Sequence, residues 1–260
     1  MASPTYWTRV RGRYMRGSAR FFFRRPLAIR TDIPLISFTF DDFPRSALQT
    51  GGAMLKHYAL GGTYYASLGL MGRRAPTGTM FIPEDLNALL EQGHELGCHT
   101  FGHCHAWDTK PDAFENSIIE NQQALRKLCP GVSFRTFSYP IGVPRARTKQ
   151  RAARHFSCCR GGGQTFNAGT ADLNYLAAYF LEKSRDDPQT VKNLIDQNRR
   201  ARGWLIFATH DISGDPTPWG CSPHFFENIL QYAVGSGARI LPVAQALEVL
   251  RTPSFVVSSS

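Results

Sequence analysis

The first 31 residues contain no acidic side chain, although eight arginines lie among them. Since the whole chain has a formal net charge of +10, its basic character belongs mainly to this segment. Arginines beside the aromatic run 21–23 can bind an anionic membrane surface or a polyanion. The alternatives are a flexible basic arm and a first element whose arginines cover the bottom of the barrel. We therefore expect a basic extension at 1–31, a domain at 32–252 and a tail at 253–260. No nucleic acid partner is expected.

Long apolar runs are also missing. No stretch of 18 apolar residues is present, and the N-terminus lacks the short apolar core and cleavage site of a secretory signal. These features predict a protein of the cytoplasm, or one held peripherally at the inner membrane. The six cysteines do not form repeated CxxC pairs, so we expect reduced thiols rather than a disulfide framework.

Internal repeats and glycine-serine linkers are absent too, which favours one domain. With 260 residues, 42% of them hydrophobic, the chain can bury one sizeable core. Segments typical of strands are predicted at 35–40, 63–68, 95–98, 134–138, 156–160, 175–181, 204–209 and 238–241. Helical segments are predicted between them at 46–58, 83–92, 111–128, 146–155, 187–202, 223–234 and 242–250. This alternation predicts an α/β fold, with seven to eight parallel strands closed into a barrel.

The pair Asp41-Asp42 follows the apolar run 35–40, which is typical of a buried parallel strand. Two adjacent carboxylates repel each other unless a positive charge lies beside them. Active sites of β/α folds gather at the C-terminal ends of the strands. The pair therefore indicates a metal ligand beside a general base, with a solvated turn before Pro44 as the alternative.

Two histidines four residues apart, His99 and His103, follow another predicted strand. If a helical turn begins there, both imidazoles lie on one face and can bind one ion. Asp42 would complete a His-His-Asp set with open positions for water and substrate. A chance pair of histidines is the alternative, and Cys98 and Cys104 are rival thiolate ligands.

Two further features follow predicted strands. His210 ends the strongly apolar run 204–209, where it fits a general acid or, alternatively, caps the next loop. In 137–142, proline and glycine after a strand predict a turn that aims a backbone N–H inward.

In this order, these features resemble the polysaccharide deacetylases of the nodulation-deacetylase type. The TFDD motif of that carbohydrate-esterase family is matched by 39–42, and its H-[ST]-x-x-H motif by 99–103. Its strand-end L-x-x-x-H element is approximated by 205–210, with one extra residue. A variant subgroup with SYP-x-G is the closer match at 138–142. The resemblance covers residues 33–250 and implies a distorted (β/α) barrel.

The resemblance further implies that the chain hydrolyses N-acetyl groups on an acetylated glycan or oligosaccharide. Asp42, His99 and His103 would hold a divalent metal, with zinc expected first and cobalt or nickel as alternatives. Asp41 would then be the base. His210 would be the acid that protonates the departing amine.

The backbone N–H of Tyr139, in the turn formed with Pro140, would bind the oxyanion. Trp219, in a Pro-rich loop, would either stack on a sugar ring or serve packing. Two family features are missing. The arginine that orients the base is replaced by serine in the SYP motif, so we expect Arg160, or less favourably Arg135, to take its place. The Asp-Trp motif that tunes the catalytic histidine is also absent, and Asp172 is a weak substitute.

Two other functions stay open. A hydrolase of non-sugar amides could use the same barrel, because metal chemistry does not recognise the sugar. A glycan-binding protein with weakened catalysis is the second alternative, although a protein that only binds needs neither a base nor an acid.

Overall fold

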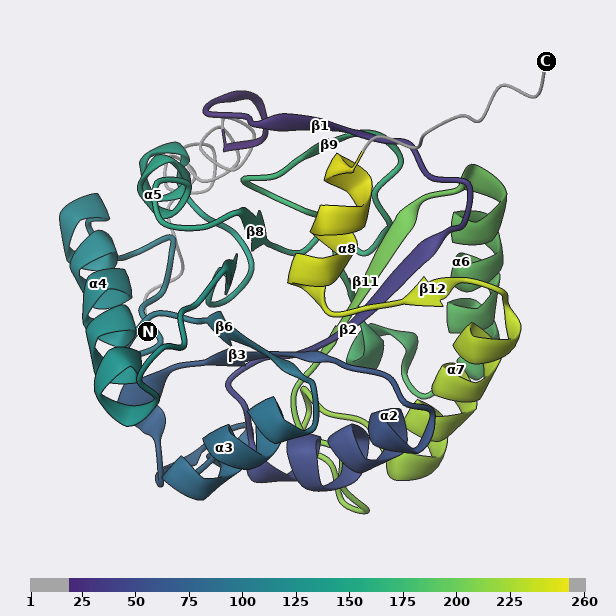
Figure 1. Cartoon of the computed structure of the whole chain (residues 1–260), viewed down its shortest axis with the longest axis horizontal. Helices are drawn as coiled ribbons and strands as arrows, with labels where there is room; N and C mark the ends of the chain where they lie inside the picture. Colours follow the sequence, from purple (N-terminus) through teal and green to yellow (C-terminus); the bar gives the residue numbers. More distant parts are fainter. Residues whose placement is uncertain (1–18, 253–260) are drawn as a thin grey trace, which may run out of the picture.

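Strand β2 (Leu35–Phe40) lies at the centre of the sheet, and all six of its residues are buried. The structure, a computed structural model, describes residues 19–252 (Figure 1). β2 runs parallel to β11 (Trp204–Thr209) along its whole length and to β3 (Thr63–Ala66) near its C-terminal end. β12 (Arg239–Ile240) pairs with the N-terminal end of β2. The apolar run predicted as a buried parallel strand is confirmed.

Parallel strands continue on both sides of β2. The order across the sheet is β10 (Tyr179–Phe180), β11, β2, β3, β6 (Glu95–Cys98), β7 (Thr136–Ser138) and β8 (Cys158–Arg160). One segment joins the two edges, because Leu176 bonds to the main chain of β8 and Tyr179 pairs with Phe207 of β11. The predicted single α/β domain with a distorted barrel of parallel strands is confirmed.

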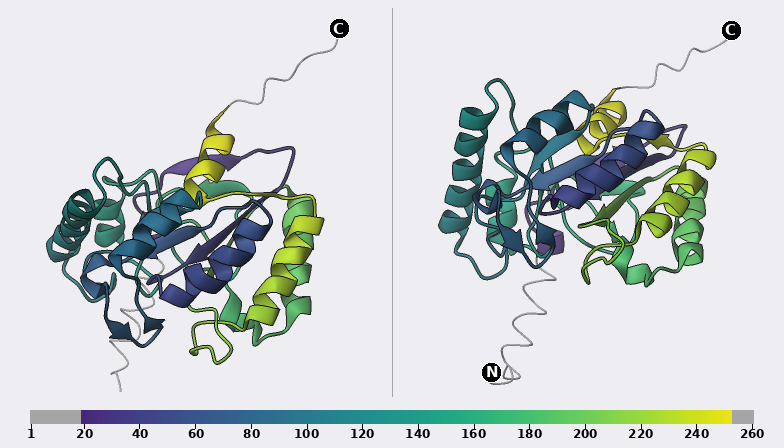
Figure 2. Two further views of the ribbon diagram at one scale, coloured as in Figure 1. Left: turned by 60° about the horizontal axis from the view of Figure 1, so that its bottom comes forward. Right: turned by 90° about the horizontal axis from the view of Figure 1, so that it is seen from below.

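Helices cover the outside of the sheet (Figures 1 and 2). They are α2 (Ala53–His57), α3 (Pro83–Glu91), α4 (Pro111–Leu128), α5 (Ala146–Ala152), α6 (Pro188–Ala201), α7 (Pro223–Gly235) and α8 (Val243–Arg251). Four begin with proline, which suits a first helical position because the missing N–H has no partner there anyway. Asp187 and Ser222 cap α6 and α7 through their side chains. The helices predicted from the sequence are present, several with shifted ends.

The helix predicted at 46–58 begins as a π-helical turn, Ala47–Gly52, and continues as α2. This turn packs closely on its neighbours. A Cβ atom added to Gly51 would lie 2.6 Å from Cδ1 of Ile212. Glycine therefore lets this turn approach its neighbours more closely than any other residue would.

Two antiparallel pairs were not expected from the sequence. β1 (Pro26–Ile29) pairs with β9 (Gly169–Asp172), and β4 (Arg74–Ala75) forms a hairpin with β5 (Gly78–Thr79). Short 3-10 turns lie at Leu68–Leu70 and Leu181–Ser184.

The expected extension ended at residue 31, whereas β1 lies within it and pairs with the domain. The part of this extension at 19–31 is thus packed on the barrel. Residues 1–18, with four of the eight arginines, and the expected tail at 253–260 lie outside the described residues. Within residues 19–252, no helix is both long enough and apolar enough to cross a membrane.

Candidate active site

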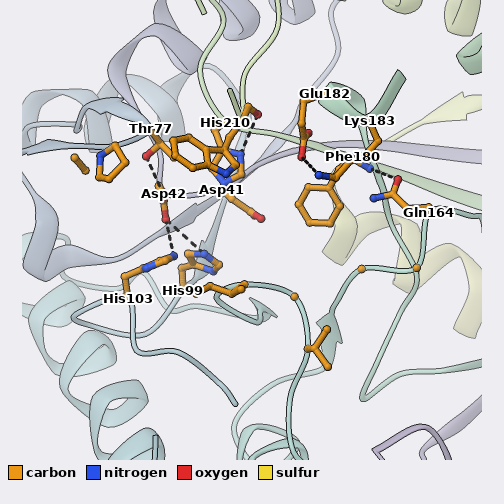
Figure 3. Close-up of a pocket in the computed structure, with 18 of the residues that line it drawn as sticks. Asp41, Asp42, Thr77, His99, His103, Gln164, Phe180, Glu182, Lys183 and His210 are labelled. Carbon is orange, nitrogen blue, oxygen red and sulfur yellow. Dashed lines mark hydrogen bonds and ion pairs between the residues drawn. The ribbon is translucent and has the colours of Figure 1, made fainter. Parts of the chain in front are cut away.

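A cavity of about 750 Å³ opens at the C-terminal ends of the strands. Six of the residues singled out from the sequence line it together, although they come from three separate strand ends and a loop. Five of them are Asp41, Asp42, His99, His103 and His210 (Figure 3). The sixth is Trp219, in the loop. Parallel strands explain this meeting, because their C-terminal ends lie on one edge of the sheet. Tyr139, Pro140 and Arg160 do not line the cavity surface.

Asp42 lies directly beyond β2 with a left-handed backbone (φ 61°). Its Oδ2 accepts a hydrogen bond from Oγ1 of Thr77, at 2.9 Å, in the turn between β4 and β5. Its Oδ1 is buried and has no hydrogen-bond partner among the described residues. Instead, Nε2 of His103 lies 3.2 Å from this oxygen and Nε2 of His99 lies 3.6 Å from it (Figure 3).

His99 faces Asp42 through an unprotonated nitrogen. Its Nδ1 lies 2.8 Å from the backbone oxygen of Ser138, which can only accept, so Nδ1 bears the proton and Nε2 keeps its lone pair. Burial lowers the pKa of His99 to about 4, although the carboxylates of Asp41 and Asp42 act in the opposite direction. The imidazole is therefore neutral near pH 7.

The two histidines reach one point through a bent loop and not through the helical turn considered above. Thr100 has φ 62° and His103 has φ 54°, both in the left-handed region. The hydroxyl of Thr100 accepts a hydrogen bond from the backbone N–H of Cys104 at 2.9 Å, which holds the bend. The pair meets as predicted, but by a different local structure.

The donor set fits a divalent cation. The ligand atoms of Asp42, His99 and His103 lie within 4.8 Å of one another. An unpaired buried carboxylate oxygen facing a neutral imidazole lone pair is costly without a positive charge between them. Cys98 is not a competing ligand here: its sulfur accepts from Nδ2 of Asn121, and burial raises its pKa to about 12, so it stays a thiol.

Asp41 is buried beside Arg160, at the end of β8. Nη2 of Arg160 donates to Oδ1 of Asp41 and, at 2.6 Å, to Oγ of Ser138. Burial alone would raise the pKa of Asp41, but the charge of Arg160, with smaller contributions from His99 and His210, lowers it to about 2. Arg160, the arginine expected to orient Asp41, is therefore in contact with it.

Arg135, the less favoured choice, bonds to Glu248 on the surface. Asp172, the substitute considered for tuning His210, bonds to Lys149 and Arg25 and not to His210. Neither residue takes part in the cavity.

His210 has a different partner. Its Nδ1 lies 3.1 Å from the backbone oxygen of Trp219, which fixes the proton on Nδ1 and leaves Nε2 for the cavity. Asp211 holds the loop in place, since its Oδ2 accepts from the backbone N–H of Thr217 at 2.8 Å. A Cβ on Gly220 would lie 2.2 Å from Oδ1 of Asp211, so the loop closes tightly at glycine. The indole of Trp219 is 41% exposed in the cavity.

The oxyanion assignment to Tyr139 is wrong. Its backbone N–H donates to the backbone oxygen of Arg160 at 3.0 Å, as part of the ladder between β7 and β8, and is not free. Pro140 does begin the expected turn, which closes with Gly142 N–H on Tyr139 O at 2.8 Å. Ile141, at the next position, lines the cavity and has φ 63°. Its backbone N–H donates to no backbone oxygen among the described residues.

Sequence reasoning missed several lining residues. Thr77 gave no signal, because its contact depends on the hairpin between β4 and β5. Ile141 was overlooked beside a more prominent tyrosine. Arg20 was counted only as charge in the extension, yet it lines the same cavity as Asp42.

Residues 28–156 match the sequence model of a family described as polysaccharide deacetylase. A curated relative, a gellan lyase from a Bacillus species, is 26% identical over 150 residues, covering 50% of this chain and 6% of that protein. The chain thus spans a small part of that relative's length.

Solved structures show the same fold. A family 4 acetyl xylan esterase from Clostridium thermocellum, in complex with cobalt, is 18% identical with a TM-score of 0.60, over 84% of this chain and 93% of that one. The CE4 domain of a xylanase from the hindgut metagenome of Trinervitermes trinervoides is 16% identical with a TM-score of 0.58, over 84% and 91%. A mutant of a CE4 family pseudoenzyme is 10% identical, with a TM-score of 0.57, over 85% of this chain and 68% of that one. This fold therefore occurs with and without catalysis.

Proposed function

Because the chain belongs to the polysaccharide deacetylase family, we propose that it is a metal-dependent hydrolase of N-acetyl groups on a glycan or glycan precursor. The observation that carries this proposal is the unpaired oxygen of Asp42 facing two histidine nitrogens. A buried carboxylate, Asp41, and a second histidine, His210, line the same cavity. A hydrolase needs these additional groups, whereas a protein that only binds glycans does not.

Asp42, His99 and His103 would hold the metal. One carboxylate and two imidazoles suit zinc, our first choice, and also cobalt or nickel. When bound, the metal lowers the pKa of water and polarises the carbonyl of the acetamide.

Asp41 would accept the proton of the attacking water. Its low pKa keeps it ionised near pH 7, so a lone pair is available. Arg160 holds Oδ1 through its guanidinium and leaves the second oxygen, Oδ2, for this proton. Arg160 is thus a positioning residue that acts through Asp41.

His210 would donate a proton to the leaving nitrogen. The water oxygen bonds to the acetyl carbon, the C–N bond breaks, and the amine takes the proton from Nε2 of His210, giving acetate and a free amino sugar. The backbone oxygen of Trp219 accepts a hydrogen bond from Nδ1 of His210. This bond stabilises the protonated imidazole, in which Nε2 carries the proton to be donated. The N–H of Ile141 is the donor that we assign to the developing negative charge on the carbonyl oxygen.

A contact with anionic membranes is the second part of the proposal. Phe21, Phe22 and Phe23 are exposed by 78%, 55% and 42%, next to Arg20 and Arg24. Exposed aromatic rings beside arginines suit the interface of a membrane with anionic lipids.

Sedimentation with vesicles of anionic or neutral lipid tests this contact. We expect binding to anionic vesicles only, and its loss in the double variant Phe21→Ser/Phe22→Ser. Ile119→Ser, on α4 and 37% exposed, is the control for removing an exposed apolar side chain. Equal sedimentation of all three proteins would overturn the membrane contact.

The activity is tested by acetate release from N-acetylglucosamine oligomers with added zinc or cobalt, beside the variant Asp41→Asn. We expect release by the wild type and a loss of about 10²–10⁴-fold in the variant. Binding of the oligomers without release would support the weakened glycan-binding alternative. Cleavage of small amides without any release from glycans would support the non-sugar hydrolase.

A further inference from the structure

The segment that follows residue 18 is fixed to the barrel through its backbone oxygens. Nζ of Lys149, on α5, donates to the oxygen of Ala19 at 2.8 Å and to that of Phe22 at 3.1 Å. Nδ2 of Asn174 donates to the oxygen of Phe23 at 2.7 Å. Three backbone groups of one short segment are therefore held by side chains that lie far away in the sequence.

These contacts form a satisfied, buried network. The side chain of Lys149 is fully buried, and its third partner is the carboxylate of Asp172. The other oxygen of Asp172 accepts from the backbone N–H of Arg25 at 2.9 Å. Because a buried ammonium is costly without such partners, the segment and the barrel stabilise each other in this position.

This anchoring places Arg20 at the cavity. Arg20 lines it together with the Asp42 set, close enough to Tyr175 for its charge to act on the tyrosine hydroxyl. Among the described carboxylates, none forms an ion pair with Arg20, whereas Lys183 in the same wall lies 3.9 Å from Glu182. Arg20 is thus a cation of the cavity wall that has no counter-charge within residues 19–252.

We propose that Arg20 binds an anionic group of the substrate, a carboxylate or a phosphate, and so makes acidic glycans or glycan phosphates the preferred substrates. This inference rests on the proposed function of the same cavity. The planar guanidinium can form two parallel hydrogen bonds with either group, and such charged bonds are among the strongest available. Three carboxylates line the cavity, and each has a basic neighbour other than Arg20. Asp41 is paired with Arg160, and Asp42 faces the histidine set. Glu182 lies 3.9 Å from Lys183.

Steady-state kinetics on three acetylated substrates test the inference: a neutral N-acetylglucosamine tetramer, a tetramer alternating N-acetylglucosamine with a uronic acid, and N-acetylglucosamine 1-phosphate. The full chain is compared with Arg20→Gln. We expect KM for at least one acidic substrate to rise about 10-fold or more, with kcat nearly unchanged, because the lost charged hydrogen bonds hold the bound substrate and not the reacting atoms. The neutral tetramer should change less than about 2-fold by the same reasoning.

The two acidic substrates distinguish the sources of negative charge. A KM effect on the uronic acid tetramer alone assigns a carboxylate, and one on the sugar phosphate alone assigns a phosphate. Arg24→Gln is the matched control, since Arg24 lies in the same segment and is exposed but does not line the cavity. Equal KM values of wild type and Arg20→Gln on both acidic substrates, or equal effects of both variants, would overturn the inference.

Calorimetric titration with the deacetylated products separates this inference from the proposed function. If no substrate releases acetate, the proposed hydrolysis fails, while tighter binding of an acidic product that depends on Arg20 still supports the inference. For Arg20→Gln we expect weaker binding of the acidic products and unchanged binding of the neutral product. Lys149→Met is a poorer test, because it leaves Asp172 buried without its partner and can unfold the domain.

Discussion

Arg160 donates a hydrogen bond from Nη2 to Oδ1 of Asp41, across 119 residues of sequence. The two side chains come from the ends of β8 and β2, which are separated by three strands of the sheet. Both are buried, so the pair needs further partners, and Arg160 finds them in Ser138 and in the backbone oxygen of Gly161. One oxygen of the carboxylate that we propose as the base is thereby fixed.

Replacing Arg160 by lysine should separate charge from orientation. Lysine keeps the positive charge but cannot bond to Asp41 and Ser138 in the same planar geometry. We expect kcat for acetate release to fall by at least about 10-fold, because a misplaced base loses alignment with the water. Arg135→Lys, which affects only a surface pair with Glu248, should retain full turnover. Similar rates for both variants would show that Arg160 does not position Asp41.

Metal binding should depend on the Asp42 set and not on histidine in general. We expect His99→Ala to reduce bound zinc, measured by elemental analysis after dialysis, from about one equivalent to a small fraction, since one of three protein ligands is lost. His105→Ala is the matched control: it removes a partly exposed histidine outside the set. Undiminished zinc in His99→Ala would overturn the ligand assignment.

His94 should make the protein less stable in mild acid. Burial, helped by the charge of Lys56, lowers the pKa of His94 from 6.5 to about 4. Its Nδ1 accepts a hydrogen bond from the backbone N–H of Gly62 at 3.0 Å, and only the neutral imidazole can accept at this nitrogen. Between pH 6.5 and 4 the unfolded state binds the proton that the folded state does not. The unfolding free energy therefore falls by about 2–3 kcal/mol as the pH decreases through this window.

Denaturant unfolding at several pH values measures this effect, with His94→Gln for comparison. Glutamine can accept the same N–H but does not titrate. Between pH 6.5 and 4, the unfolding free energy of the wild type should fall more steeply than that of His94→Gln. Above pH 7, the two curves of unfolding free energy against pH should be parallel. Parallel curves throughout would remove His94 as the cause.

Ile141 should tolerate glycine unusually well. A β-branched residue at φ 63° is strained by about 1–3 kcal/mol, and its side chain is 61% exposed, so little burial is lost. We expect Ile141→Gly to raise the unfolding free energy by about 1 kcal/mol while keeping the N–H and the activity. Ile33→Gly, at a site 51% exposed and without positive φ, should lower it by a similar amount. Equal destabilisation of both would show that Ile141 is not strained.

The sequence was sufficient where a residue's place depends on strand ends. The buried run 35–40 predicted a parallel strand, and the carboxylates after it necessarily lie at the C-terminal edge of the sheet. Arg160 ends another strand of that sheet, and for the same reason it comes into contact with Asp41. The meeting of His99 and His103 was predicted, but the left-handed backbone that produces it has no signal in residue spacing.

Prediction failed where a contact depends on register or on distant packing. Whether the N–H of Tyr139 is free depends on its pairing with β8, which residue types alone do not specify. The place of Arg20 depends on Lys149, 130 residues away from the Ala19 oxygen that it holds. The sequence therefore left open whether the segment at 19–31 is a flexible arm or a first element on the barrel. In the structure it packs on the barrel, and Arg20 forms part of the cavity wall.

Acetate release from an acetylated glycan by the metal-free full chain, measured during titration with zinc, tests most directly whether hydrolysis depends on this site. We predict at least about 100-fold lower activity without metal, with full recovery near one equivalent and no recovery in His99→Ala. Unchanged activity in the metal-free protein, or full recovery in His99→Ala, would contradict the claim that Asp42, His99 and His103 hold the metal on which hydrolysis depends.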